Sequence, residues 1–293
     1  MAEQIGSHPS VALLGTGIMG AAMGRCMLRA GLPLRVWNRT QDKARALEAE
    51  GASIAATPAD AVKDAQVIVT MLADTDTVAD TMAAAEPGLR SGQVWLQAST
   101  VGVAGLSRLA MLASTHDLIF VDSPVIGTRA PAEKGALIVL AAGPDEARAP
   151  AQHVFDAIGS RTLWLGEAGA GSRLKLVVNS WVLALTTAAA EALALAQGLD
   201  IDPRLFMETV SGGPLDCAYL QTKAAAILDG DFTPSFTVKL AGKDARLVAG
   251  AAVDAGVRLD VAPAVAARFR RAAELGHAAQ DMAATYFASF DGR

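Results

Sequence analysis

The sequence predicts an α/β fold in which a doubly wound sheet is followed by an all-α C-terminal domain, joined to it by a long interdomain helix. Two observations support this prediction. Short apolar runs alternate with helix-like segments up to residue 165, and only helical segments follow Gly171. Near-continuous apolar runs are typical of parallel strands that are covered on both faces. Their alternation with helices implies right-handed crossovers.

The expected elements follow in chain order. Apolar runs predict strands over residues 11–14, 34–37, 67–72, 94–97, 118–121 and 137–141. Helical patterns predict helices over 21–30, 43–50, 174–197, 203–210, 218–228, 238–255 and 263–274. The composition changes from α/β to all-α near residues 166–171. We therefore expect a cofactor-binding domain over 1–168 and a helical substrate and dimerisation domain over 169–293.

Composition narrows the class of protein. Hydrophobic residues make up 52% and charged residues 19% of the 293 residues, which is typical of packed globular proteins. The net charge of −5 comes without a basic stripe, so we expect no nucleic-acid partner. The two cysteines, Cys26 and Cys217, are too few and too far apart for a disulfide framework, which favours a reducing compartment.

One stretch, residues 181–196, is apolar enough to be tested as a membrane span. It contains Glu191 and is shorter than the roughly 20 apolar residues that a span requires. The first ten residues lack the basic-then-apolar pattern of a secretory signal. We therefore interpret the stretch as a buried core helix and expect a cytoplasmic protein that does not enter a membrane.

The first expected strand leads into Gly15-Thr16-Gly17-Ile18-Met19-Gly20, a G-x-G-x-x-G pattern that opens a helix. In such a turn the first glycine permits the sharp bend, the second lets a pyrophosphate approach the backbone, and the third allows helix and strand to pack closely. The helix N-terminus then presents unpaired N–H groups to the phosphates. The flanking strand and helix distinguish the pattern from an ordinary glycine-rich turn. It predicts a Rossmann-type domain, with Gly15, Gly17, Ile18, Met19 and Gly20 at the cofactor.

The end of the second expected strand indicates which nicotinamide cofactor is used. NAD sites place a carboxylate there to bind the ribose 2′-hydroxyl. This chain has Asn38-Arg39-Thr40, whose side chains can all donate hydrogen bonds to a 2′-phosphate, and Lys43 adds charge nearby. Alternatively, Arg39 is a solvated loop residue and Thr40 caps the next helix. We predict NADP as the cofactor. Further cofactor contacts are expected at Met71 and Leu72, where the third strand run ends.

The candidate proton-transfer group is a lysine. None of the four histidines follows an expected strand inside a polar cluster, and no group of Cys, His, Asp and Glu has metal-ligand spacing. Lys175 and Asn179 lie four residues apart at the start of the long helix, so they share one face among apolar neighbours. Lys175 could act as a general acid, with Asn179 holding it or the substrate oxygen. The alternative is a lysine that extends its ammonium group into solvent.

Four segments, in order, resemble the β-hydroxyacid dehydrogenase family, which includes 3-hydroxyisobutyrate dehydrogenases, tartronate semialdehyde reductases and glyoxylate/succinic semialdehyde reductases. They are the glycine fingerprint, Asp122-Ser123-Pro124-Val125-Ile126-Gly127-Thr128, the Gly171…Lys175…Asn179 pattern, and Lys243-Asp244. The resemblance covers nearly the whole chain and is strongest to the glyoxylate/succinic semialdehyde group, also through Arg129-Ala130-Pro131-Ala132-Glu133.

The resemblance implies a role for each matching residue. Lys175 would be the catalytic acid/base and Asn179 its partner at the substrate. Ser99 and Thr100 would lie by the nicotinamide, with Thr100 assigned to the cofactor and Ser99 to the substrate. Lys243 would reach the cofactor from the second domain. Further substrate contacts implied by the resemblance are Phe236 and Asp244, although Phe236 could instead be core, and Lys243 with Asp244 a surface pair.

The substrate loop departs from the family pattern, which reads Ser-Gly-Gly or Ser-Gly-Ser after Pro-Val. Here Ile126, Gly127 and Thr128 occupy those positions, and we assign all three to substrate binding. An aliphatic side chain cannot donate a hydrogen bond to a substrate carboxylate. Either Thr128 replaces the missing hydroxyl, or the substrate is larger and more apolar.

These observations predict an NADPH-dependent reductase of small carbonyl substrates such as semialdehydes or glyoxylate, with Lys175 as the proton donor. One alternative is an imine reductase, a group that looks similar but usually has Asp or Tyr where Lys175 stands. Another is a non-catalytic NADP-binding protein, which would not need Lys175, Asn179 and Lys243 together. The long helix is apolar on more than one face, and we expect its residues Trp181, Leu183 and Leu185 to be covered in a homodimer.

Overall fold

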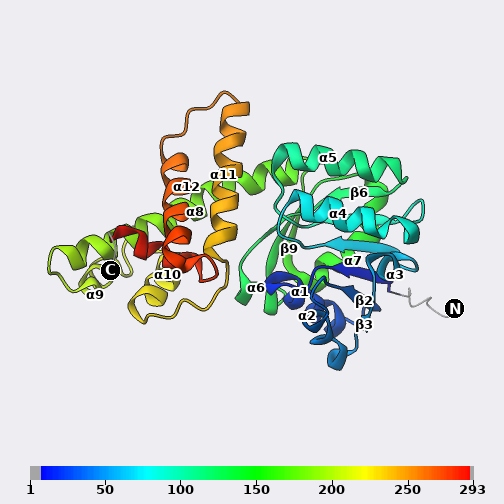
Figure 1. Ribbon diagram of the computed structural model, residues 1–293, viewed down its shortest axis with the longest axis horizontal. Helices are drawn as coiled ribbons and strands as arrows, with labels where there is room; N and C mark the ends of the chain where they lie inside the picture. Colours follow the sequence, from blue (N-terminus) through cyan, green and yellow to red (C-terminus); the bar gives the residue numbers. More distant parts are fainter. Residues whose placement is uncertain (1–7, 291–293) are drawn as a thin grey trace. The chain divides into compact units, whose positions relative to one another are not determined.

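The computed structural model describes residues 8–290 (Figure 1). The chain forms two compact units, Met1–Lys175 and Leu176–Arg293. Their boundary falls inside α8 (Ala170–Gly198), so this helix contributes residues to both units.

The first unit is built on a parallel six-stranded sheet with the order β3-β2-β1-β4-β5-β6. Its strands are β1 (Val11–Leu14), β2 (Leu34–Trp37), β3 (Ser53–Ile54), β4 (Val67–Thr70), β5 (Val94–Gln97) and β6 (Ile119–Asp122). Figure 1 shows helices on both sides of this sheet. The arrangement confirms the predicted doubly wound sheet, because parallel neighbours require a crossover between each pair.

Each face of the sheet carries its own apolar cluster. On one face, Val11, Leu13 and their in-register neighbours pack against α1 (Ile18–Arg29) and α7 (Arg148–Ile158). On the other face, Ala12, Leu14 and Trp95 pack against α3 (Pro58–Val62), α4 (Thr75–Ala85) and α5 (Gly102–Thr115). The strands are buried on both sides, which is why they read as continuous rather than alternating apolar runs.

A second, three-stranded sheet was not predicted. It consists of β7 (Val125–Ile126), β8 (Leu137–Ala141) and β9 (Gly159–Trp164), with β7 antiparallel and β9 parallel to β8. The strand expected at 137–141 is therefore present, but it does not belong to the main sheet. Strand β7 is only two residues long, and β9 begins with Gly159-Ser160-Arg161-Thr162, so neither gives an apolar run.

Other boundaries differ slightly from those expected. Strand β4 ends at Thr70, two residues early, because Met71 and Leu72 already belong to the loop beyond the sheet. Helix α1 begins at Ile18, three residues before the predicted start, since Gly17 is its N-cap. The segment expected to be helical at 43–50 divides into α2 (Gln41–Arg45) and the short helix η1 (Glu48–Glu50). The remaining elements of this unit are η2 (Glu86–Gly88), α6 (Arg129–Glu133) and η3 (Asp145–Ala147).

The second unit is helical in its described part. It contains the C-terminal part of α8, followed by α9 (Pro203–Val210), α10 (Ala218–Leu228), α11 (Val238–Asp254), α12 (Val261–Ala272), η4 (Ala273–His277) and η5 (Met282–Ser289). By length and composition, α8 would pass as a membrane span, and 44% of its most apolar stretch is buried. Its inner residues Leu183, Ala190 and Leu193 pack in the core of this unit, whereas Trp181 is 65% exposed. Leu183, expected to be covered by the second copy of a homodimer, is instead covered within its own chain.

A buried ion pair connects three segments of the second unit. Lys223 on α10 lies 2.7 Å from Asp281, just before η5, and both side chains are 4% exposed. Asp281 also accepts hydrogen bonds from the backbone N–H and hydroxyl of Ser235 (2.9 and 2.6 Å) and from the N–H of Ala283 (3.0 Å). Burial alone would raise the pKa of Asp281, but the Lys223 ammonium and these hydrogen bonds bring it below the ordinary 3.8.

Asp281→Ala should lower the free energy of unfolding by about 3–5 kcal/mol, because it leaves the Lys223 ammonium buried without its carboxylate. The pKa of Asp281 is lower in the folded than in the unfolded protein, so its stabilisation is present above 3.8 and is lost as pH falls through the folded value. Urea unfolding at pH 7 and at descending pH measures both effects. Asp254→Ala, an exposed position on α11, serves as the control. Equal losses in the two variants would contradict the assignment.

Candidate cofactor and catalytic site

The carboxyl edge of the main sheet brings together the loops that the sequence assigned to the cofactor. Leu14, the last residue of β1, is in register with Trp37 of β2 and Thr70 of β4. The next residues therefore lie side by side: the Gly15 N–H donates to the Trp37 carbonyl (2.9 Å), and the Met71 N–H donates to the Leu14 carbonyl (3.0 Å). Ligands bind at this edge in open α/β sheets.

The three glycines of the fingerprint have different surroundings. Gly15 has φ +106°, and a Cβ there would collide with the Met71 carbonyl oxygen. A Cβ on Gly20 would collide with the Gly15 carbonyl oxygen. A Cβ on Gly17 would meet nothing within 4 Å, at the exposed N-terminus of α1. The first and third glycines are thus required by packing. The second keeps open the space through which a pyrophosphate would reach the helix N–H groups, so the residues present fit a dinucleotide.

Asn38 organises this loop instead of presenting a free side chain. Its Oδ1 accepts from the Thr16 N–H (3.0 Å), and its Nδ2 donates to the Thr40 carbonyl (2.9 Å). Arg39, Thr40 and Lys43 are exposed, and none of these side chains has a hydrogen bond or ion pair to any residue between 8 and 290. The Thr40 side chain makes no capping bond to α2. These three groups are therefore the ones available to a 2′-phosphate.

Ser99, which the resemblance assigned to the substrate, holds the loop beyond β4 in place. It is completely buried, and its hydroxyl accepts from the Leu72 N–H (2.8 Å) and donates to the Thr70 carbonyl (3.3 Å). The Gln97 side chain bonds to the backbone of Ser99 in both directions, at 2.8 and 2.9 Å. Ser99 consequently ties the ends of β4 and β5 together, and the neighbouring Thr100 is half-buried.

Asp122, at the end of β6, binds the first turn of α8. Its Oδ2 accepts from the backbone N–H groups of Gly169 (3.1 Å) and Ser172 (2.7 Å), and its Oδ1 accepts from the Ser172 hydroxyl (2.7 Å). Burial raises the pKa of Asp122 above its ordinary value, although the bonds from Ser172 and Gly169 and the charge of Arg173 oppose the shift. Lys175 follows Ser172 by one helical turn and is half-buried.

In the sequence, Asp122 stands out only as part of the resemblance. An acidic residue at the end of an apolar strand is the signal that could have indicated its role.

The predicted substrate loop follows β6. Ile126 lies in β7 opposite Ile138 and is half-buried. Gly127 has φ +129°, where a Cβ would press against Leu137, so glycine is required there. Thr128 precedes α6 and makes no capping bond with its side chain. The Thr128 hydroxyl is therefore not committed to the helix that it precedes.

A separate polar cluster lies in the second unit. Asn179 on α8 donates from Nδ2 to Asp244 Oδ2 (2.8 Å), and Asp244 Oδ1 lies 2.9 Å from the Lys243 ammonium. Asn179 and Asp244 are each 3% exposed, so Lys243 and Asp244 are not a surface pair. Phe236 is half-buried and packs against the apolar cluster of this unit, which agrees with the alternative that it is core.

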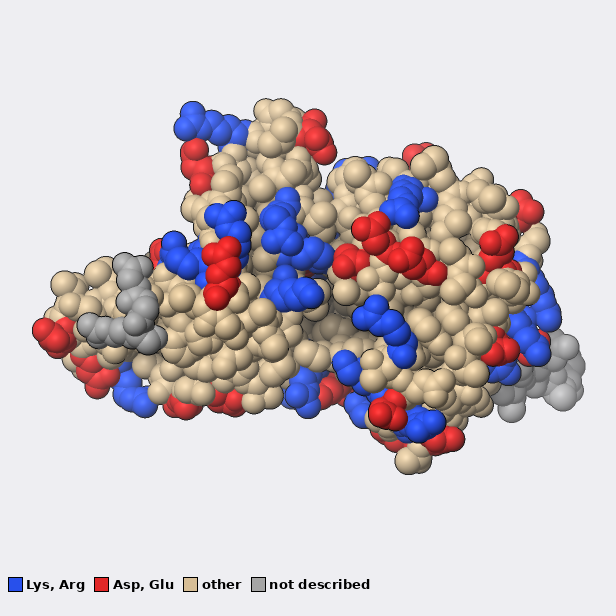
Figure 2. Space-filling model, viewed as in Figure 1, with Lys and Arg blue, Asp and Glu red and all other residues tan. Residues whose placement is uncertain are grey.

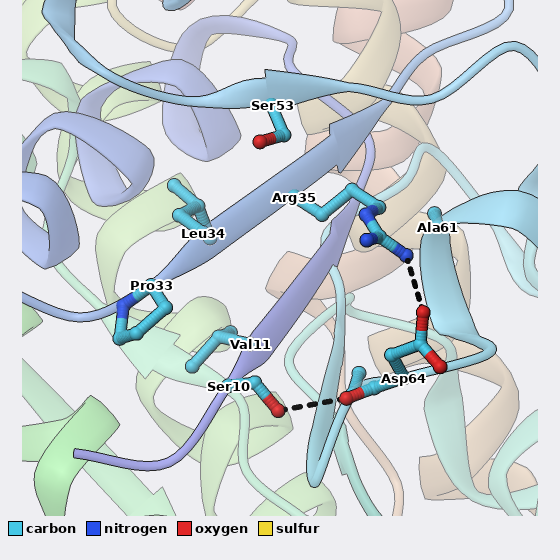
Figure 3. A pocket seen from close by; sticks show the side chains of 9 residues that line it. Ser10, Val11, Pro33, Leu34, Arg35, Ser53, Ala61 and Asp64 are labelled. Carbon is cyan, nitrogen blue, oxygen red and sulfur yellow. Dashed lines mark hydrogen bonds and ion pairs between the residues drawn. The ribbon is translucent and has the colours of Figure 1, made fainter. Parts of the chain in front are cut away.

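The cavity drawn in Figure 3 lies in the first unit at the amino ends of β1, β2 and β3, at the opposite edge of the main sheet from the cofactor loops. Its volume is about 130 Å³. Three of its polar residues already pair with one another: Arg35 lies 3.4 Å from Asp64, and the Ser10 hydroxyl donates to the Asp64 carbonyl (2.8 Å). On the face drawn in Figure 2, acidic and basic side chains are interspersed between broad uncharged areas.

Gly17→Ala should leave the thermal midpoint of the free protein unchanged and raise the dissociation constant of NADPH at least about tenfold, a loss of about 1.4 kcal/mol. The added methyl group has space in the protein but occupies the approach of the pyrophosphate. Gly20→Ala is the comparison, because its methyl group collides with the backbone and should lower the midpoint itself. Thermal unfolding and fluorescence titration measure the two effects. Unchanged NADPH affinity in Gly17→Ala would refute this assignment.

Comparison with known proteins assigns both halves of the chain. Residues 10–166 match a family model described as the NAD binding domain of 6-phosphogluconate dehydrogenase. Residues 169–288 match a model described as the NAD-binding domain of NADP-dependent 3-hydroxyisobutyrate dehydrogenase. Together the two models cover nearly all described residues.

Several relatives align along most of the chain. Glyoxylate/succinic semialdehyde reductase 1 from Arabidopsis thaliana is 31% identical, over 91% of this chain and 93% of the relative. The chloroplastic reductase 2 from the same plant is 30% identical, over 94% and 78%. The human cytokine-like nuclear factor N-PAC is 29% identical over 94% of this chain but only 50% of its own length.

Solved structures show the same fold. The 3-hydroxyisobutyrate dehydrogenase from Salmonella typhimurium has a TM-score of 0.88 and 26% identity, and covers 94% of this chain and 98% of its own. An imine reductase from Pseudomonas sp. shares the fold at a TM-score of 0.64 and 23% identity, over 97% and 100%. With family models matched over residues 10–166 and 169–288, and with a reductase aligned along 91% of this chain and 93% of its own length, the chain belongs to the NAD(P)-dependent β-hydroxyacid dehydrogenase family, of the 3-hydroxyisobutyrate dehydrogenase-like type.

Proposed function

We propose that this protein is an NADPH-dependent reductase of small carbonyl compounds, with Lys175 as the proton donor. The position of Lys175 is the observation that carries the proposal. It lies one turn beyond Ser172, which Asp122 binds to the carboxyl edge of the sheet that also carries the glycine fingerprint. Within the first unit, the candidate acid and the cofactor loops thus belong to the same edge.

NADPH, when bound, supplies a hydride to the carbonyl carbon. As the carbon–oxygen double bond becomes single, its oxygen gains the electron pair and needs a proton. The Lys175 ammonium donates that proton, and the neutral amine is reprotonated from solvent. Asn179, oriented by its bond to Asp244, serves as the partner of Lys175 at the substrate oxygen. Lys243, also beside Asp244, is assigned to the cofactor.

The preference for NADP rests on the end of β2. No acidic side chain stands at Asn38-Arg39-Thr40, and the exposed Arg39, Thr40 and Lys43 offer donors and positive charge. A guanidinium group forms strong charge-assisted hydrogen bonds with phosphate oxygens. Asn38 contributes by holding the loop, since its amide already bridges Thr16 and Thr40.

The substrate is proposed to be a semialdehyde, glyoxylate or a related aldehyde or ketone. The relatives named for glyoxylate and succinic semialdehyde support this class. Ile126 cannot donate to a carboxylate, whereas the Thr128 hydroxyl is not used as a helix cap. A panel of glyoxylate, succinic semialdehyde, simple aldehydes and a cyclic imine, assayed with NADPH, tests the class. Turnover of the imine alone would favour the alternative of an imine reductase.

We further propose that the protein is a homodimer. On α8, Val177 and Trp181 are each 65% exposed and Leu195 is 63% exposed. Large exposed apolar side chains that lie along one element usually mark an interface. A monomer mass in light scattering at micromolar concentration would count against this proposal.

Arg39→Ala should raise the dissociation constant of NADPH by about tenfold or more and leave that of NADH nearly unchanged, because only NADPH carries the 2′-phosphate. Wild-type protein should itself prefer NADPH by at least about tenfold. Fluorescence titration with both cofactors measures the affinities. Arg45→Ala, an exposed arginine at the end of α2, is the matched control. Equal losses for NADPH and NADH would show that Arg39 does not bind the 2′-phosphate.

Lys175→Ala should lower kcat by roughly 10²–10⁴-fold, the usual effect of removing a general acid. Lys175→Met keeps most of the side-chain volume but has no proton to donate, so it should be nearly as inactive. NADPH affinity should barely change in either variant. Steady-state kinetics on the best substrate of the panel and NADPH titration give both readouts. Near-normal turnover by the methionine variant would show that Lys175 is a packing residue and not the proton donor.

A further inference from the structure

The carboxylate of Asp122 is buried in the first unit, and all its polar contacts run to one target, the start of α8. It is completely inaccessible, yet it accepts hydrogen bonds from the Gly169 N–H, the Ser172 N–H and the Ser172 hydroxyl at 2.7–3.1 Å. Gly169 and Ser172 lie 47 and 50 residues away in the sequence. The contacts therefore fix one end of a distant helix to the end of β6.

The cost of burying this group argues against a simple stabilising role. Taking a carboxylate out of water is unfavourable unless its hydrogen bonds compensate for the lost hydration. Burial raises the pKa of Asp122 in spite of its three donors, so the compensation is incomplete. An apolar residue would pack at the end of a strand without this penalty, but it could not define the position of the helix start.

The packing of Gly171 restricts the same turn from a second direction. A Cβ on Gly171 would collide with the Leu140 carbonyl oxygen and lie 3.1 Å from the Asp122 carbonyl oxygen. The first turn of α8 therefore rests directly on the backbone of β8 and β6. Together with the hydrogen bonds to Asp122, this contact sets the position of α8 along its axis and its rotation about that axis. Lys175 lies one turn further along the helix.

Asp122 also belongs to a row of polar side chains across the sheet. Thr70, Gln97 and Asp122 are in register at the last positions of β4, β5 and β6, and all are completely buried. Through Gln97, this row holds Ser99 and hence the loop beside the expected nicotinamide position. One row thus positions both that loop and the helix that carries the lysine.

We propose that Asp122 is a positioning residue for carbonyl reduction, which holds the start of α8 so that the Lys175 ammonium is correctly placed for proton transfer. The proposal rests on the proposed role of Lys175. Displacing a catalytic group by about 1 Å can cost roughly 10²-fold in rate. Asp122 itself needs no contact with substrate or cofactor.

The test compares Asp122→Ala with Asp122→Asn. Asparagine is nearly the same shape: its oxygen can keep both N–H bonds, and its NH₂ group can donate to the Ser172 hydroxyl oxygen. We expect Asp122→Ala to lose roughly 10²-fold in kcat, with NADPH affinity unchanged, and Asp122→Asn to stay within a few-fold of wild type. Ser172→Ala, which removes one bond only, should fall between them.

Gln93→Ala is the matched control. Gln93 is buried directly before β5, at the amino edge of the same sheet, where its side chain donates to the carbonyls of Val62 and Ala65, both at 2.7 Å. The Gln93→Ala variant should have a lower thermal midpoint of unfolding but an unchanged kcat. If Asp122→Ala keeps its kcat, if Asp122→Asn is as impaired as Asp122→Ala, or if Gln93→Ala loses kcat equally, the positioning role is refuted.

Lys175→Met separates this proposal from the function on which it rests. If Lys175→Met retains turnover, the proposed proton donor is wrong. If it loses turnover but Asp122→Ala does not, only the positioning role is wrong. In the Lys175→Met background, Asp122→Ala should cause little further loss of kcat, because both changes act on one step.

Discussion

Parallel, in-register pairing of the main sheet is the constraint on which the first unit depends. Strands β1, β2, β4, β5 and β6 end level with one another, so Leu14, Trp37 and Thr70 lie in one row. The residues that follow them are Gly15 of the glycine fingerprint, Asn38, whose side-chain amide holds the loop, and Met71, whose backbone packs against Gly15. In any other register of strand pairing Gly15 would no longer lie beside Met71. The glycine turn would then lose its packing against the Met71 backbone.

Buried polar groups add a second level of organisation to each unit. At the carboxyl edge of the sheet, Thr70, Gln97, Ser99 and Asp122 form hydrogen bonds where apolar contacts alone would leave several loop arrangements equally stable. In the helical unit, Asp281 gathers Lys223, Ser235 and Ala283 in the same way. Such groups are costly to bury, but once their hydrogen bonds are formed they fix the arrangement of the groups that they contact. Both units therefore use apolar packing for cohesion and polar contacts for position.

The likeness to glyoxylate and succinic semialdehyde reductases gives this chain a family but not a substrate. The loop from Ile126 to Thr128 is where it departs from the family pattern, and its backbone remains constrained by Gly127 and by pairing with β8. A change of side chain on a loop whose backbone is held in this way alters which groups meet a ligand without altering where they stand. This separation of scaffold from contact group is common in folds that serve many reactions.

Local signals in the sequence determined most of the fold. The apolar runs located six strands, the glycine pattern located the cofactor turn, and the end of the strand signals located the helical region, because each depends on neighbours within a few residues. Strands β3, β7 and β9 escaped detection because the first two are each two residues long and the third begins with polar residues. The burial of Leu183, the bridging by Asn38, the enclosed hydroxyl of Ser99 and the three bonds of Asp122 were decided only by tertiary structure. Each depends on groups distant along the chain, and hydrogen-bond partners of that kind leave no periodic pattern in a single sequence.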